Sequence, residues 1–200
     1  MFDASPSEFR KRHRAAPVPP RPTRVHYAAD GRVEAFEPVS GEGDMIDVRI
    51  EERQAIRVAF IRHVGPYDGV GPTWQKMFAW ASPLGLVGPG TTPIGLCHDD
   101  PDVTPRDRVR YDACLAVDER TQPQSEMGVQ EIPAGEFAVA AHHGPYERLG
   151  ETYRTLCGQW LPRSGREPAS RPAYEIYLNS PLTAAPEDLM TDIYLPLEPN

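Results

Sequence analysis

The stretch that decides the fold is His63-Val64-Gly65-Pro66-Tyr67-Asp68, because it recurs 79 residues later as His142-His143-Gly144-Pro145-Tyr146-Glu147. Downstream positions match at the same offset: Gly71 with Gly150, Thr73 with Thr152, Trp74 with Tyr153 and Met77 with Leu156. With one more residue of slip, Asp112 and Leu115 fall on Asp192 and Leu195. A shared H-x-G-P-Y-[DE] motif with matched positions after it indicates an internal duplication.

Both repeats predict the same order of elements. A short apolar run precedes each Gly-Pro dipeptide and is typical of a strand that ends where proline removes a ladder donor. Pro66 and Pro145 fit the first turn of a helix, and apolar residues follow at helical spacing. The predicted strands lie at about 58–61, 94–98 and 109–117 in one half and at about 137–140, 173–178 and 191–197 in the other.

This order predicts an α+β fold of two strand-helix-strand-strand modules, at about 45–120 and 121–200. A module with one helix leaves one sheet face uncovered, so we expect the two modules to associate around a pseudo-twofold axis. Their antiparallel sheets would then surround a central cleft, and such junctions commonly bind small molecules.

Composition excludes several classes of protein. The 200 residues are 40% hydrophobic and 25% charged with a mean hydropathy of −0.51, which is the range of globular domains. No apolar run approaches the roughly 20 residues of a membrane span. The first residues contain no apolar signal region, so a cytoplasmic location is expected. Cys97, Cys114 and Cys157 form no C-x-x-C pair, and we expect neither disulfides, a metal nor a cofactor.

Charge is distributed unevenly. The chain has 21 basic and 29 acidic residues, a net charge of −8. Residues 1–24 carry six basic residues against Asp3 and Glu8, so the remaining residues hold a balance of −12. An acidic body repels nucleic acid and attracts cations.

The residues before the repeats divide into two segments. Residues 15–22 contain four prolines and cannot continue a helix. We therefore interpret 15–44 as a proline-rich linker, although Asp30-Gly31 favours a short hairpin within it. The folded domain is expected at 45–200.

Several motifs together resemble the GyrI-like small-molecule-binding domain. They are the paired H-x-G-P-Y units, Gly95-Leu96-Cys97-His98-Asp99-Asp100-Pro101 with Arg110-Tyr111-Asp112-Ala113-Cys114, and Tyr174-Glu175-Ile176-Tyr177-Leu178-Asn179 with residues 189–197. The resemblance covers about 45–197. It implies two modules around a ligand cleft, found alone or behind the DNA-binding domains of AraC-type and MerR-type regulators.

The resemblance implies that a buried acidic residue among aromatic rings binds lipophilic cations, and this role falls on Glu175. Strand alternation places Glu175 and Tyr177 on one face, and we expect Leu96 and His98 to be their repeat equivalents on that face. The alternative is that Glu175 is a plain exposed strand residue. The remaining candidates for ligand contact are Trp74, Phe78, Tyr111 and Tyr146, with Tyr194 as a further aromatic residue.

Residues 2–11 resemble the end of an AraC-type DNA-binding domain. Ser5 can cap a helix, Pro6 fits its first position, and Glu8 completes a capping box. The segment 1–14 is thus interpreted as a remnant of a helix-turn-helix. Because a recognition helix needs its partner helix, we expect this chain to bind DNA weakly or not at all.

The expected function is that of a small-molecule effector-binding domain of an AraC-family transcriptional regulator. Two alternatives stay open. One is a hydrolase of cyclopropanoid compounds, which the resemblance also includes, with Glu175 and Tyr177 as its catalytic residues. The other is a protein-binding module that inhibits DNA gyrase.

Overall fold

The computed structural model describes residues 23–27, 33–38, 46–88 and 90–199. By its contacts the chain divides into two compact units, Met1–Asp44 and Met45–Asn200. The interpretation of residues 1–14 as a helix-turn-helix remnant lies outside the described residues. Within the described part, no helix has the length and apolar character needed to cross a membrane.

The first unit contains two short strands. β1 (Thr23–Tyr27) and β2 (Val33–Pro38) pair antiparallel, on either side of Asp30-Gly31. Both lie within the stretch 15–44 that the sequence predicts as a linker. Part of that stretch is therefore a hairpin, as its turn residues indicate.

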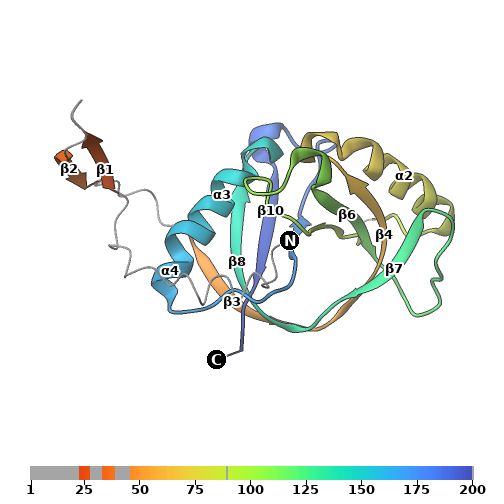
Figure 1. The fold of residues 1–200 in the computed structure, drawn as a ribbon. Coiled ribbons are helices and arrows are strands. Elements are labelled where there is room, and N and C mark those ends of the chain that lie inside the picture. Colours follow the sequence, from red (N-terminus) through yellow and green to blue (C-terminus); the bar gives the residue numbers. More distant parts are fainter. Residues whose placement is uncertain (1–22, 28–32, 39–45, 89, 200) are drawn as a thin grey trace, which may run out of the picture. The chain divides into compact units, whose positions relative to one another are not determined.

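The second unit is built on one eight-stranded antiparallel sheet with the order β3-β8-β10-β9-β5-β6-β4-β7 (Figure 1). The predicted α+β class is confirmed, and both modules share this continuous sheet. Its strands are β3 (Val48–Arg53), β4 (Ile56–Val64), β5 (Pro93–Cys97), β6 (Arg110–Ala116), β7 (Met127–Ile132), β8 (Gly135–His143), β9 (Ala173–Tyr177) and β10 (Met190–Pro196).

Each module has one more strand than the sequence predicts. β3 precedes the first repeat but pairs with β8 of the second, whereas β7 precedes the second repeat and pairs with β4 of the first. Each module thus lends an edge strand to the other. β3 was missed because four of its six residues are charged, a composition that protects an exposed edge but hides the strand pattern.

The central pair of strands, β5 and β9, lies at the junction of the modules. Gly95 pairs with Glu175, Ile94 with Ile176 and Leu96 with Tyr174. This register is symmetric about the Gly95 and Glu175 pair. The pseudo-twofold axis therefore passes beside Glu175.

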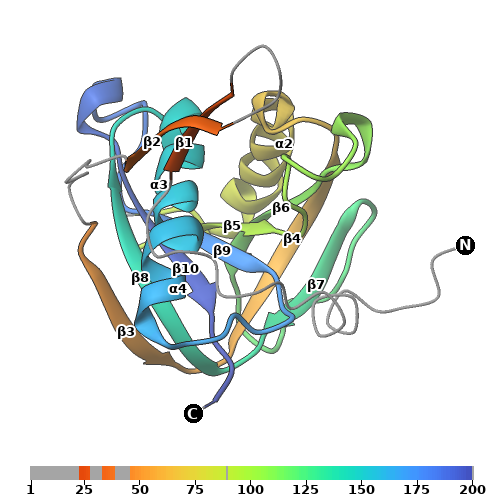
Figure 2. The ribbon, with the colours of Figure 1, turned by 60° about the vertical axis from the view of Figure 1, so that its left-hand side comes forward.

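Two helical segments cover one face of the sheet (Figure 2). In the first module α2 (Gly71–Ala81) packs Met77 and Ala81 on the strands. In the second, α3 (Leu149–Thr155), a π-helical turn (Leu156–Trp160) and α4 (Leu161–Ser164) pack Leu156 on the strands. Figure 2 shows β5 and β9 between α2 and α3.

The π-helical turn explains the slip between the repeats. The 3-10 turns that begin at Tyr67 and Tyr146 differ by 79 residues, but Gly85 and Gly165, the left-handed glycines that end the two helical segments, differ by 80. A π-turn is commonly a one-residue bulge in an α-helix. The extra residue of the second module therefore lies within its helix, before β9.

The repeated H-x-G-P motif forms a turn. His63 and His142 each place Nε2 close to the carbonyl oxygen of the following proline, Pro66 at 3.1 Å and Pro145 at 3.2 Å. The glycine between them has a positive φ that side chains rarely adopt, 138° in the first repeat and 123° in the second. Because 3-10 turns follow the prolines, the α-helices begin later than predicted, at Gly71 and Leu149.

The other face of the sheet carries a separate apolar cluster. Ile132 of β7 and Phe137 of β8 belong to it, although their strands lie far apart in the sheet order. The sheet must curl for these residues to share one cluster. We call this side the concave face and the opposite side the helix-covered face.

Candidate ligand cleft

Glu175 lies on the helix-covered face, between the two helical segments. It is only 5% exposed. Alternation along β9 places Tyr177 on the same face, and directly opposite Glu175 on β5 stands Gly95. The alternative interpretation, that Glu175 is an exposed strand residue, does not agree with this burial.

A chain of hydrogen bonds ends on this carboxylate. The indole Nε1–H of Trp74 donates to the hydroxyl of Tyr111 (3.0 Å), which lies 2.9 Å from the hydroxyl of Tyr177, and Tyr177 donates to Oε2 of Glu175 (2.6 Å). An indole N–H can only donate, so Tyr111 accepts from Trp74. Because Tyr177 donates to Glu175, Tyr111 in turn donates to Tyr177, and every hydrogen bond in the chain is directed towards Glu175. We call these four residues the Glu175 relay.

Aromatic rings from both modules surround the relay. Trp74 stacks on Phe78 with ring centroids 5.5 Å apart and meets Tyr177 edge-on at 5.8 Å. Tyr146 meets Tyr177 at 5.3 Å from the second module. Five predicted aromatic residues, from α2, β6, β9 and the turn before α3, therefore gather near Glu175: Trp74, Phe78, Tyr111, Tyr146 and Tyr177.

Gly95 makes room for the relay. A Cβ at this position would stand 2.5 Å from the hydroxyl of Tyr111 and 2.6 Å from that of Tyr177. Real Cβ atoms do not approach other atoms so closely. The two tyrosine hydroxyls can thus meet above β5 only because residue 95 has no side chain.

Burial controls the protonation of Glu175 and the tyrosines around it. Burial raises the pKa of Glu175, and hydrogen bonding to Tyr177, with smaller effects of Tyr153 and Cys97, offsets part of that rise. The pKa values of Tyr111 and Tyr177 are raised well above the usual value, first by burial and then by the negative charge of Glu175. The tyrosines therefore remain hydrogen-bond donors, and Glu175 is more readily protonated than an exposed carboxylate.

Two residues near Glu175 were not predicted. Cys97 places Sγ 3.6 Å from Oε1 of Glu175. Tyr153 lies close enough to affect the pKa values of both, yet its buried hydroxyl forms no hydrogen bond of ordinary geometry within the described residues. The repeat contains a signal for each: Tyr153 matches Trp74 at the offset of 79, and Cys97 matches Tyr177 at the offset of 80.

His98 does not lie beside Glu175, contrary to expectation. Because the extra residue lies in the helix, the repeat equivalents of Glu175 and Tyr177 are Gly95 and Cys97. Alternation then directs Leu96 and His98 to the concave face, where Leu96 joins the apolar cluster. Tyr194 also lies on that face, stacked on Tyr174 at 4.5 Å.

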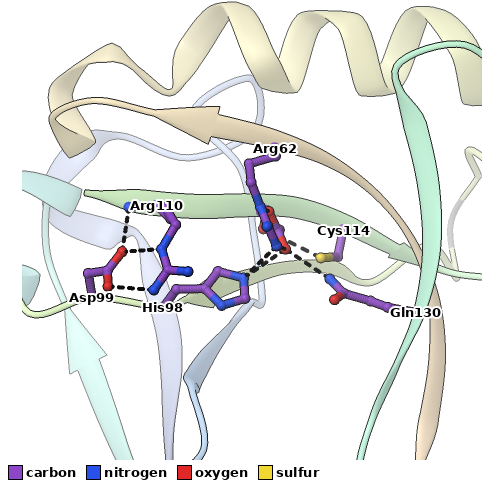
Figure 3. A network of polar contacts seen from close by, with 7 residues as sticks. Arg62, His98, Asp99, Arg110, Cys114 and Gln130 are labelled. Atoms are coloured by element: carbon purple, nitrogen blue, oxygen red, sulfur yellow. Dashed lines mark hydrogen bonds and ion pairs between the residues drawn. The ribbon is translucent and has the colours of Figure 1, made fainter. Parts of the chain in front are cut away.

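His98 instead joins Arg62 and Gln130 in a polar network (Figure 3). The network surrounds Asp112, a residue with no exposed surface. Arg62 donates two hydrogen bonds to this carboxylate, at 2.7 and 2.8 Å. Nε2 of His98 lies 2.8 Å from it, and the amide of Gln130 donates at 2.9 Å. Burial by itself would raise the pKa of Asp112, but hydrogen bonds from Arg62, His98 and Gln130 together hold it well below its usual value.

Comparison with known families agrees with this geometry. The family model of the GyrI-like small molecule binding domain matches residues 46–198. The chain belongs to this family. The match covers all eight strands of the sheet and both helical segments, so the GyrI-like domain is the second unit of the structure. Within the described residues no cluster of three or more His, Cys, Asp or Glu side chains is placed to hold a metal ion.

Curated relatives have two kinds of name. The probable transcriptional regulator YgiV of Escherichia coli is 31% identical over an alignment of 156 residues, and the match covers 76% of this chain and 96% of that protein. A DNA gyrase inhibitor of Serratia proteamaculans is 35% identical over an alignment of 145 residues, and the match covers 66% of this chain and 86% of that protein.

Solved structures share the fold at lower identity. The C-terminal domain of EcmrR superposes with a TM-score of 0.62 at 21% identity, covering 77% of this chain and 98% of that domain. The match covers only 58% of the EcmrR chain that was solved with DNA. A hydrolase from Listeria innocua gives 0.59 at 16% identity, covering 78% and 94%. A protein bound to tetraphenylphosphonium gives 0.54 at 15% identity, covering 76% and 94%.

Proposed function

We propose that the GyrI-like domain binds lipophilic or aromatic cations at Glu175 and serves as the effector-binding part of a transcriptional regulator. One observation carries the proposal: Glu175 is a buried carboxylate that has no basic partner among the described residues. A buried ionised carboxylate is costly unless a cation pairs with it. A ligand cation would supply the missing partner.

The surrounding rings favour a flat or greasy cation. Trp74, Tyr146 and Tyr177 present aromatic surface beside the carboxylate. A cation over an aromatic ring gains about 0.5–2 kcal/mol, more where water is excluded. In the present geometry Tyr177 occupies one oxygen of Glu175, so a ligand would replace this hydrogen bond or share the carboxylate with it. The similar fold bound to tetraphenylphosphonium is consistent with such a ligand.

The regulatory role is proposed for an AraC-type protein of the cytoplasm. Residues 2–11 support this assignment by resemblance alone, and relatives named as transcriptional regulators are compatible with it. Ligand binding would shift the domain between two conformations by its differential affinity for them. Any DNA contact would come from a helix-turn-helix rather than from the GyrI-like domain.

Titration followed by tryptophan fluorescence tests the proposal. The probes are tetraphenylphosphonium and neutral triphenylphosphine oxide, added to wild type, Glu175→Gln and Glu147→Gln. Glu147 is an exposed residue beside Tyr146, so its variant removes the same charge without altering the cleft. We expect the cation to bind at least tenfold more weakly to Glu175→Gln, a change of about 1.4 kcal/mol, and normally to Glu147→Gln. Equal binding of both probes to all three proteins would contradict the proposal.

A second candidate is hydrolysis of strained cyclopropanoid compounds. The observation in its favour is that Glu175, with a raised pKa, is hydrogen-bonded to Tyr177. Glu175 would take a proton from water as the oxygen bonds to a ring carbon, and Tyr177 would protonate the electron pair of the breaking C–C bond. Chromatography of a cyclopropanoid incubated with the protein tests this reaction, and conversion no faster than in buffer would exclude it for that compound.

A third candidate is inhibition of DNA gyrase, favoured by the names of several relatives. The acidic charge of residues 25–200 would complement a basic surface on a DNA-binding enzyme. A supercoiling assay with purified gyrase decides this point. Unchanged supercoiling at high concentrations of this protein would exclude the activity.

A further inference from the structure

The concave face contains a hollow of about 220 Å³, and Glu175 is not among the residues that line it. It lies where the bend between β7 and β8 approaches the start of β9 and the end of β5. Leu96, Ile132 and Phe137 form apolar walls, and His98, Gln130 and Arg171 add polar groups. Apolar walls with a few polar groups are the usual composition of a small-molecule site.

The charge of the hollow is positive. Arg171 has no acidic partner among the described residues: one N–H bonds to the carbonyl of Ala134 (2.9 Å), and the guanidinium lies 5.6 Å from the centroid of the Phe137 ring. A guanidinium carries five N–H donors, so several remain for a ligand. The negative charge of Asp112 is matched by Arg62, which binds it with two hydrogen bonds.

Glu131 is the one acidic residue that borders the hollow. Its neighbour Gln130 points to Asp112 on the concave face. Alternation along β7 therefore directs the side chain of Glu131 to the opposite face, so that its backbone borders the hollow. Its carboxylate does not neutralise Arg171.

His98 adds a second polar group with unused capacity. An ionised Asp112 only accepts hydrogen bonds, so Nε2 of His98 carries the hydrogen of their contact. Its Nδ1 has no hydrogen-bond partner among the described residues, and the imidazole lines the hollow. The Asp112 network thus fixes the ring in place, and Nδ1 of the neutral ring is left as a hydrogen-bond acceptor that could take a hydroxyl or amide hydrogen of a ligand.

We propose that this hollow is a second ligand site, which binds a small organic anion with one apolar ring. The carboxylate of the ligand would bind the guanidinium of Arg171, and its ring would lie on Phe137 and Leu96. Drug-sized ligands occupy pockets of roughly 300–1,000 Å³, so a hollow of this volume suits a compound about as large as benzoate. The concave face would thus bind an anion at Arg171, whereas the helix-covered face would bind a cation at Glu175.

The test is a titration with 4-methylbenzoate and neutral 4-methylbenzamide, followed by NMR of the ¹⁵N-labelled full chain. Arg171→Gln removes the proposed contact, and Arg163→Gln is the matched control because it removes the same charge from an exposed position. Glu175→Gln is included to separate this site from the cation cleft. Thermal unfolding of each variant confirms that it is folded.

We expect 4-methylbenzoate to shift the amide signals of Leu96, Gln130 and Ile132, with at least tenfold weaker binding to Arg171→Gln and unchanged binding to Arg163→Gln and Glu175→Gln. Equal binding of the amide and the carboxylate, or shifts confined to residues near Glu175, would overturn the proposal. If Arg171→Gln is unfolded, Arg171→Lys keeps the charge, and retained binding with less shift at Phe137 is then expected. Loss of carboxylate binding in a folded Arg171→Lys would contradict a charge-selected site.

Discussion

Asp112 on the concave face and Glu175 on the helix-covered face are both buried carboxylates, but their hydrogen-bond partners differ. On the concave face, Asp112 is surrounded by donors from Arg62, His98 and Gln130, and its pKa is held low. On the helix-covered face, Glu175 receives hydrogen bonds from neutral groups alone, and burial raises its pKa. The comparison separates a carboxylate that stabilises the fold from one that is left available for a ligand.

The pseudo-symmetry makes this difference sharper. Glu175 and Gly95 are equivalent positions, and the relay residues Trp74, Tyr111 and Tyr177 have Tyr153, Thr191 and Cys97 as their counterparts. The first set is linked by hydrogen bonds, whereas the hydroxyls of Tyr153 and Thr191 are buried without partners within the described residues. Duplication thus supplied a symmetric frame, and divergence placed one acidic residue on its axis.

The largest effect is expected from Asp112→Asn, which leaves Arg62 and His98 facing a neutral amide. We predict that it lowers the free energy of unfolding by roughly 2 to 3 kcal/mol, because hydrogen bonds to charged groups are strong and their loss is costly in a buried site. Denaturation by urea measures the change. The matched variant is Asp192→Asn, because Asp192 is the repeat equivalent and its one ion pair among the described residues is with the half-exposed Arg49; it should cost less than Asp112→Asn.

The same variant has a defined pH dependence. The pKa of Asp112 is lower in the folded state than its ordinary value of 3.8, so its contribution is complete above that value and is lost as the pH falls towards the folded pKa. The stability difference between wild type and Asp112→Asn should therefore shrink below pH 3.8. A difference that stays constant down to acid unfolding would mean that Asp112 is not the stabilising carboxylate.

The next largest effect is expected on the helix-covered face. Gly95→Ala would force the hydroxyls of Tyr111 and Tyr177 apart, at a cost of about 1–3 kcal/mol typical of overpacking. It should also weaken cation binding, since the Glu175 relay is broken. Gly150→Ala is the control: nothing lies within 4 Å of the added Cβ, so stability should stay the same or rise by up to about 1 kcal/mol. Equal effects of both substitutions would contradict the role of Gly95.

The smallest expected effect has the opposite sign. Glu175→Gln should raise the free energy of unfolding at pH 7 by about 1 kcal/mol, because it removes an unpaired buried charge. The same substitution should weaken cation binding, so stability is gained where function is lost. The pKa of Glu175 is higher in the folded state than its ordinary 4.5, so the wild type is relieved of this penalty as the pH falls through the folded pKa. The advantage of the variant should thus disappear near pH 4.5. A loss of stability in Glu175→Gln at pH 7 would show that the carboxylate stabilises the fold.

The sequence predicted the features that depend on the internal repeat and on the alternation of side chains along a strand. The H-x-G-P-Y repeat indicated the modules and their strands, and the alternation in Tyr-Glu-Ile-Tyr placed Glu175 and Tyr177 on one face. The edge strand β3 was missed because its charged residues hide the strand pattern and its partner β8 lies far away in sequence. Such pairing follows from the tertiary structure and leaves no local pattern.

The prediction that His98 shares a face with Glu175 was wrong for a different reason. A shift of one residue moves a strand residue to the other face of a sheet. The sequence shows that one extra residue separates the later parts of the repeats, but it does not show whether that residue lies before or after β9. The π-helical turn at 156–160 shows that the extra residue lies before β9. Cys97 is therefore the repeat equivalent of Tyr177 and lies near Glu175, and His98 lies in the Asp112 network.

The most direct test of cation binding at Glu175 is an NMR spectrum of the three tryptophan indole N–H signals, recorded with and without tetraphenylphosphonium. Trp74 is part of the Glu175 relay, whereas the indole of Trp80 is bonded to Gln124, which is not part of the relay. We predict that the Trp74 signal moves on saturation, that the Trp80 signal stays, and that neither moves in Glu175→Gln at the same concentration. Saturable binding that leaves Trp74 unmoved, or that persists unchanged in Glu175→Gln, would contradict the account.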